Sequence, residues 1–165
     1  MSKKIKDPKS IHPKFLLKLI NKAKEYLKKD KTMKRICDDY DCDISIIDTI
    51  PTRFGEIDVS AKTDHGIIIL NYELLEDGDF FKDYSYLVHE YTHYLQQCMG
   101  KKATQGADDG NYLDNPYEKE GFQNQVQFIS DQFGDKEAEK YVEHLLEHHD
   151  MSDDMDKKEE LMSLV

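Results

Sequence analysis

The segment His89-Glu90-Tyr91-Thr92-His93 constrains the fold of this chain more than any other feature. Residues four apart lie one turn apart on the same face of an α-helix, so both imidazoles can reach one tetrahedral metal ion. Glu90 is rotated by about 100° from His89 around such a helix, which puts its carboxylate beside the metal rather than on it. The spacing therefore predicts a helix with two zinc ligands and a neighbouring carboxylate.

Glu90 is the predicted general base of this site. Zinc with three protein ligands and an open position lowers the pKa of a bound water to about 7, and a nearby carboxylate can then take a proton as the water attacks a carbonyl. The motif is short, so it needs a helical, half-buried setting. Leu87, Tyr91 and Leu95 recur at helical intervals, and no Gly or Pro lies between Phe80 and Met99. A surface helix with solvated His and Glu is the alternative.

A second helix is predicted from about Pro116, because a proline at the first position and acidic residues in the first turn are typical of a helix start. Glu118 and Glu120 follow that proline. A helix packed against the first would direct its early turns at the two histidines. Either carboxylate could supply the third zinc ligand, and we favour Glu118.

These residues resemble the gluzincin metallopeptidases, in which His-Glu-x-x-His is followed, on a later helix, by a ligand glutamate with a small residue three positions on. His89, Glu90, His93, Glu118 and Gly121 match that pattern. The resemblance covers roughly residues 67–129. It implies a zinc-dependent peptidase that cleaves peptide bonds within a peptide or protein substrate.

The chain departs from some relatives just after the ligand glutamate. The ImmA/IrrE type usually has Ala at the small position and Asn or Asp next to it, where this chain has Gly121 and Phe122. In those relatives the Asn or Asp commonly orients a ligand histidine, which a phenylalanine cannot do. Asp114, Asn115 and Asn124 are the candidates to replace it.

Three β-rich stretches precede the motif, at residues 43–50, 53–62 and 66–72, with turn-like sequences between them. They predict a small mixed sheet packed on the active-site helix. With the second ligand-bearing helix, they favour a compact α+β domain of the zincin type. The resemblance to gluzincins makes residues 67–71 the candidate strand at the rim of the cleft, although so apolar a run also suits a central strand buried on both faces.

Charge divides the chain into parts of opposite sign. Residues 1–36 contain 13 Lys or Arg and 3 Asp or Glu, a net of +10, whereas the remainder contains 10 and 31, a net of −21. We predict a basic amphipathic helical segment over 1–36, a zincin-like metallopeptidase core over 37–149, and an acidic, mobile tail over 150–165.

The basic segment favours a packed helix with a solvated lysine face, the usual amphipathic arrangement. Contact with nucleic acid or an acidic partner is the alternative for this segment. The acidity of the rest argues against an enzyme that acts on nucleic acid. The sequence leaves the oligomeric state open.

The chain has no apolar run near the roughly 18 residues that span a membrane, and no signal-peptide core. Its three cysteines, Cys37, Cys42 and Cys98, are an odd set that suits a reducing compartment. We therefore expect a cytoplasmic protein without membrane contact. A second histidine pair, His144 and His148, also has helical spacing, but we predict that it lies in solvent.

The sequence thus predicts a zinc metallopeptidase with Glu90 as its catalytic base. The alternative is a non-catalytic or narrowly targeted regulatory module that binds a protein partner on the same fold. The natural substrate cannot be inferred from these residues.

Overall fold

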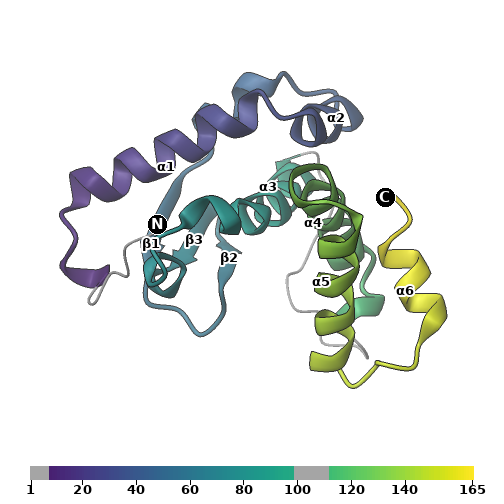
Figure 1. The fold of residues 1–165 in the computed structure, drawn as a ribbon. Helices are drawn as coiled ribbons and strands as arrows, with labels where there is room; N and C mark the ends of the chain where they lie inside the picture. Colours follow the sequence, from purple (N-terminus) through teal and green to yellow (C-terminus); the bar gives the residue numbers. More distant parts are fainter. Residues whose placement is uncertain (1–7, 99–111) are drawn as a thin grey trace.

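The computed structural model describes residues 8–98 and 112–165, so residues 1–7 of the predicted basic segment and 99–111 of the predicted core lie outside it. Its helices are α1 (Pro13–Lys28), α2 (Lys31–Asp39), α3 (Tyr84–Cys98), α4 (Pro116–Phe133), α5 (Asp135–His148) and α6 (Met155–Leu161). Its strands are β1 (Thr52–Gly55), β2 (Ala61–Asp64) and β3 (Ile67–Asn71). In Figure 1, α3 lies between the strands and the group formed by α4, α5 and α6. The predicted α+β class is confirmed.

The sheet is small and mixed, as predicted, with strand order β1-β3-β2. β1 runs parallel to β3, and β2 runs antiparallel to it. β3 is therefore the central strand, and its Ile68 and Leu70 are fully buried. Two roles were open for residues 67–71: the buried central strand is confirmed, and the rim strand is wrong, because both edges of β3 are paired. β2 is the edge strand that packs on α3.

Residues 43–50 form no strand, although they are rich in β-branched side chains. Ile44–Thr49 is a 3₁₀ helix instead. The Asp43 carboxylate accepts a hydrogen bond from the Ser45 amide at 3.0 Å, and the Thr49 hydroxyl donates to the Ile46 carbonyl at 2.7 Å. These local bonds offer the backbone partners that a sheet would otherwise supply.

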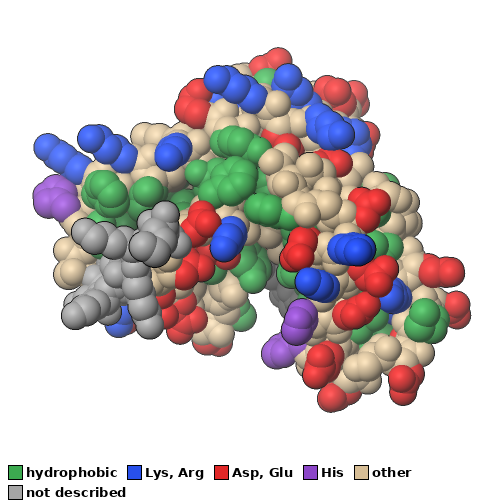
Figure 2. Space-filling model, in the orientation of Figure 1, with side chains coloured by type: hydrophobic (Ala, Val, Ile, Leu, Met, Phe, Trp, Pro, Cys, Tyr) green, Lys and Arg blue, Asp and Glu red, His purple; other side chains and the backbone are tan. Residues whose placement is uncertain are grey.

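Two apolar clusters form the core. The first joins α1, α2, the sheet and α3, and it includes Ile20, Leu27, Ile36 and Leu87. The boundary predicted after Ile36 therefore falls inside α2, in this first cluster. The second cluster joins α4, α5 and α6. Figure 2 shows Lys and Arg side chains along the outer side of α1 and α2.

Helix α6 lies within the segment predicted as a mobile tail, and here the structure differs from the prediction. Leu161 is fully buried in the second cluster. Lys157 is also buried, and its ammonium group pairs with Asp114 at 2.6 Å and with Glu160 at 3.0 Å. The buried Leu161 and the Lys157–Asp114 ion pair dock α6 against the rest of the molecule, whereas the Lys157–Glu160 pair lies within α6.

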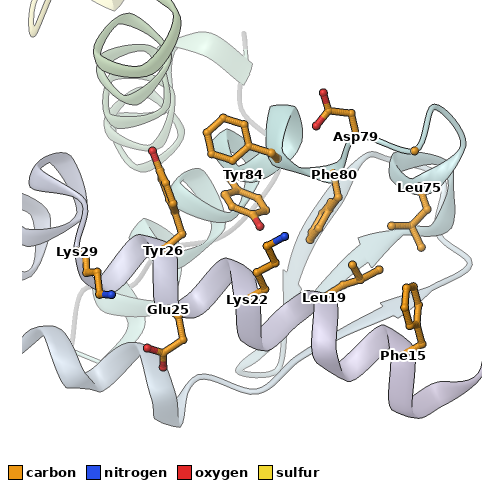
Figure 3. Close-up of a pocket in the computed structure, with 12 residues that line it drawn as sticks. Phe15, Leu19, Lys22, Glu25, Tyr26, Lys29, Leu75, Asp79, Phe80 and Tyr84 are labelled. Atoms are coloured by element: carbon orange, nitrogen blue, oxygen red, sulfur yellow. The ribbon is translucent and has the colours of Figure 1, made fainter. Parts of the chain in front are cut away.

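A pocket of about 720 Å³ lies between α1 and the segment that leads into α3. Figure 3 shows Phe15 and Leu19 of α1 facing Leu75 and Phe80, and the Lys22 side chain pointing towards Tyr84 and Phe80. Phe15 is 51% exposed, so this side of α1 is only partly covered. Among the described helices, none combines the length and apolarity needed to cross a membrane.

Candidate metal centre

Helices α3 and α4 bring the three predicted ligands together. His89 and His93 lie one turn apart on α3, and Glu118 stands in the first turn of α4. The start of α4 is fixed by Asn115, whose side-chain oxygen accepts a hydrogen bond from the Tyr117 amide at 2.8 Å. Pro116 follows at the first helical position, where its missing amide hydrogen costs nothing.

The ligand atoms form a nearly regular triangle. Glu118 Oε1 lies 3.1 Å from His89 Nε2 and 2.9 Å from His93 Nε2, and the two Nε2 atoms are 3.1 Å apart. Zinc bonds of about 2.0–2.1 Å give a tetrahedron with edges of roughly 3.3 Å. The triangle is therefore close in size to one face of a zinc coordination tetrahedron.

Two glutamines orient the histidine rings. Gln125 Oε1 lies 3.1 Å from His89 Nδ1, and Gln96 Oε1 lies 2.8 Å from His93 Nδ1. An amide oxygen only accepts hydrogen bonds, so each neutral ring carries its hydrogen on Nδ1 and keeps a lone pair on Nε2. Partners of this kind fix both the tautomer and the direction of a metal-binding histidine.

The glutamine amides are themselves held in one orientation. Gln96 Nε2 donates to the Tyr117 carbonyl at 3.1 Å and to Glu120 Oε1 at 2.7 Å. The Tyr40 hydroxyl donates to the same Glu120 oxygen. Glu120, the alternative third ligand, thus faces Gln96 and Tyr40 rather than the triangle. It holds the Gln96 amide in the orientation that points the Gln96 oxygen at His93.

Gly121 allows the His89 ring to lie directly against α4. A Cβ at this position would stand 2.9 Å from Cε1, 3.0 Å from Nε2 and 3.1 Å from Nδ1 of His89. Phe122 covers another side of the same ring, with centroids 4.5 Å apart at 66°. The residue that departs from the related pattern therefore packs on His89 and confines it, although it cannot hydrogen-bond to it.

Glu90 lies beside the triangle, 4% exposed. The Thr63 hydroxyl, on edge strand β2, donates to Glu90 Oε1 at 2.8 Å. A fixed carboxylate next to three converging donors is what the motif predicted. No sequence pattern pointed to Thr63, because a threonine in a strand is ordinary.

The cluster attracts positive charge. Burial alone would lower the pKa of His93, but the hydrogen bond and charge of Glu118, with the charge of Glu90, raise it to about 9. Burial would raise the pKa of Glu118, but hydrogen bonds from His89 and His93 hold it well below its ordinary range. A cation is therefore favoured where the three ligand atoms meet.

The three residues predicted to orient a histidine serve elsewhere. Asn115 caps α4, and Asp114 pairs with Lys157. Asn124 Nδ2 donates to Thr92 Oγ1 at 3.1 Å, and Asn124 Oδ1 accepts from Arg35 Nη2 at 2.7 Å. Gln96 and Gln125 take their place, and the sequence did not reveal them because glutamine is common on helix surfaces.

Within the described residues, His89, His93 and Glu118 are the one group of three or more His, Cys, Asp or Glu that could hold a metal ion. His144 and His148 lie exposed on α5, as predicted. No protein-family model, curated protein or solved structure matches this chain.

Proposed function

We propose that this protein is a zinc-dependent peptidase. The observation that supports it most is the convergence of His89 Nε2, His93 Nε2 and Glu118 Oε1, each within 3.1 Å of the other two, beside the Glu90 carboxylate. Two imidazoles and one carboxylate form the ligand set of a catalytic zinc site, because they leave the fourth position open. A structural site would close that position with another Cys or His.

The donor set fits zinc on chemical grounds. Both Nε2 lone pairs are directed by hydrogen bonds at Nδ1, and the Glu118 carboxylate carries the compensating charge. A zinc ion held by these residues would act as a Lewis acid and lower the pKa of water. We infer zinc rather than magnesium or calcium, because imidazole nitrogens are ligands that the hard cations avoid.

Glu90 would act as general base and then as general acid. Its carboxylate accepts the proton of the attacking water and afterwards returns it to the leaving amine nitrogen. The Thr63 hydroxyl holds Glu90 Oε1 in place, which limits the motion that would separate base and water. The low exposure of Glu90 also strengthens its electrostatic effect.

The substrate would be an extended peptide or an unfolded protein segment. Among the described strands, β2 has one paired edge and carries Thr63, the residue that contacts Glu90. An extended peptide can add to such an edge through main-chain hydrogen bonds, which would place a peptide bond near Glu90. Hydrolysis within a chain is therefore favoured over removal of a terminal residue.

We further propose a cytoplasmic location. The three cysteines are free thiols, and Cys37 is buried, where burial first, and then the neighbouring Cys42 and Asp38, raise its pKa to about 12. Thiols of this kind persist in a reducing compartment.

The test combines metal analysis with turnover. Wild type, His93→Ala, Glu118→Gln, Glu120→Gln and Glu90→Gln are purified without a histidine tag, and zinc per chain and cleavage of unfolded casein are measured. We expect one zinc in wild type, with its loss in His93→Ala and Glu118→Gln. Glu120→Gln should still bind zinc, although more weakly, because Glu120 supports Gln96 and is not itself a ligand.

Glu90→Gln decides between catalysis and binding. It should retain zinc but lose at least about a hundredfold in turnover, since general acid–base catalysis contributes that much. A wild type without zinc, or a Glu90→Gln variant as active as wild type, would refute the proposal. Either result would favour a regulatory module that binds a protein partner.

A further inference from the structure

A second groove, of about 520 Å³, opens between the start of α3 and the side of α5. Its lining includes Asp83, Ser85, Tyr86, Phe133, Tyr141 and His144. We call it the α3–α5 groove. Figure 2 shows the surface hollowed on the side of α5 that carries exposed histidine.

The α3–α5 groove adjoins the candidate metal centre. Tyr86 lies four residues before Glu90 on α3, so the two share a face one turn, or about 5.4 Å, apart. Ser85 accepts a hydrogen bond from Gln125 Nε2 at 3.3 Å, and the other end of that amide holds His89. A substrate residue next to the cleaved bond would therefore reach the groove.

Asp83 is an acidic residue in the lining of the α3–α5 groove. Its carboxylate is partly buried, and within the described residues no hydrogen bond or ion pair engages it. Burial first, and the charges of Asp77 and Asp79 second, raise the pKa of Asp83 to about 7, against the opposing effect of Lys82. A positive group beside Asp83 would offset both the burial of its negative charge and the repulsion from Asp77 and Asp79.

The other charged groups of the groove do not supply that positive group. Lys82 pairs with Asp79 at 3.7 Å, and Lys140 pairs with Glu137 at 3.3 Å. The charged side chains that line the groove are Lys82, Asp83, Glu137 and Lys140, and Tyr86, Tyr141 and His144 are its other titratable groups. Both lysines already pair with carboxylates, so within the described residues Asp83 is the charged group of the lining that has no ion-pair partner.

We propose that the α3–α5 groove binds a lysine or arginine side chain of the peptide substrate, with Asp83 as its partner. The inference rests on the proposed peptidase function and names the substrate class of that same site. The aliphatic part of such a side chain would lie along Phe133 and Tyr141, while its charged end reaches Asp83.

The test maps cleavage sites and then measures matched peptides. Zinc-loaded full-length wild type, Asp83→Asn and Asp83→Lys digest unfolded casein, and mass spectrometry identifies the bonds cut. Quenched peptides that differ only in Arg, Leu or Glu at the selected position then give kcat/KM. Asp153→Asn removes an exposed carboxylate outside the groove lining and is the matched control.

We expect Lys or Arg at one fixed position relative to the cleaved bond. Asp83→Asn should lower kcat/KM for the Arg peptide at least about tenfold, the usual effect of losing a charged hydrogen bond, and leave the Leu peptide unchanged. Asp83→Lys should favour the Glu peptide, and Asp153→Asn should match wild type.

Two outcomes would overturn the inference without touching the peptidase proposal. One is cleavage with no preference for basic residues, and the other is an equal loss for Arg and Leu peptides in Asp83→Asn, which would mean a structural role. If wild type cuts no peptide at all, the peptidase proposal fails and this inference fails with it.

Discussion

Gly121→Ala should weaken zinc binding although the changed residue offers no ligand atom. The new Cβ would stand 2.9–3.1 Å from three atoms of the His89 ring, whereas carbon atoms in contact prefer about 3.5–4.0 Å. The ring must therefore retreat by roughly 0.5 Å or more. It is enclosed by Phe122 on one side and tied to Gln125 on another, so it cannot do so freely.

The magnitude follows from the tolerance of the metal bond. Zinc–ligand distances vary by only about 0.2 Å, less than the required shift. Disturbing a group that supports a metal ligand costs about 10- to 100-fold in affinity, and we expect a loss in that range for Gly121→Ala. Alanine also favours the helix by about 1 kcal/mol over glycine, so the metal-free protein should lose little stability.

The assay is a competition titration in which a chromogenic chelator and the protein share a limited amount of zinc. Gly55→Ala, on strand β1, is the matched control. Its new Cβ would also be crowded, with Arg53 Nη1 and Ile69 Cγ2 each 3.0 Å away, but far from the metal centre. Its zinc affinity should stay within about twofold of wild type, as for distant sites. A Gly121→Ala protein that binds zinc like wild type and is more stable would refute this reasoning.

Three further changes test other parts of the structure. Thr63→Val removes the hydroxyl that donates to Glu90 and should lower kcat about tenfold with zinc content unchanged; equal turnover in steady-state assays would contradict this. Leu161→Ala should cost about 2–5 kcal/mol in urea unfolding, because Leu161 is fully buried; a loss under 1 kcal/mol, on the order of an exposed site, would mean α6 is not docked. The pKa of Asp83 is raised from 3.8 to about 7, chiefly by burial, so its ionisation destabilises the folded state and stability should fall as pH rises between those values. Asp83→Asn should flatten this part of the stability profile and be the more stable protein at pH above about 7.

The sequence could predict that His89, His93 and Glu118 converge because this prediction rests on local sequence patterns. Helical spacing alone puts His89 and His93 on one face, and the proline at the start of α4 sets the position of Glu118. The choice between Glu118 and Glu120 needed the structure, since both lie near the same helix start. Only the packing of α4 on α3 shows that Glu120 faces Gln96 instead.

Other features depend on contacts distant in sequence and could not be predicted. The β-branched run of residues 43–50 had the composition of a strand, but the cap at Asp43 favours a short helix. The stretch 53–62 covers β1 and the start of β2, with a loop between them whose Ile57 and Val59 carbonyls accept hydrogen bonds from Asn71. Gln125 acquires its role from His89, 36 residues away.

The interface between α3 and α4 combines apolar side chains, such as Phe122 and Phe128, with an unusual number of buried polar ones. Asn124 and Gln125 of α4 are buried there with Glu118 and the histidines. The alignment of the two helices therefore depends on hydrogen bonds as well as on apolar packing, and with zinc bound as proposed it would depend on the metal too. Metal that binds only the folded chain adds its binding free energy to the free energy of unfolding. If the proposed zinc site holds, the supply of zinc in a cell would govern how many copies of the protein survive degradation, besides how many are active.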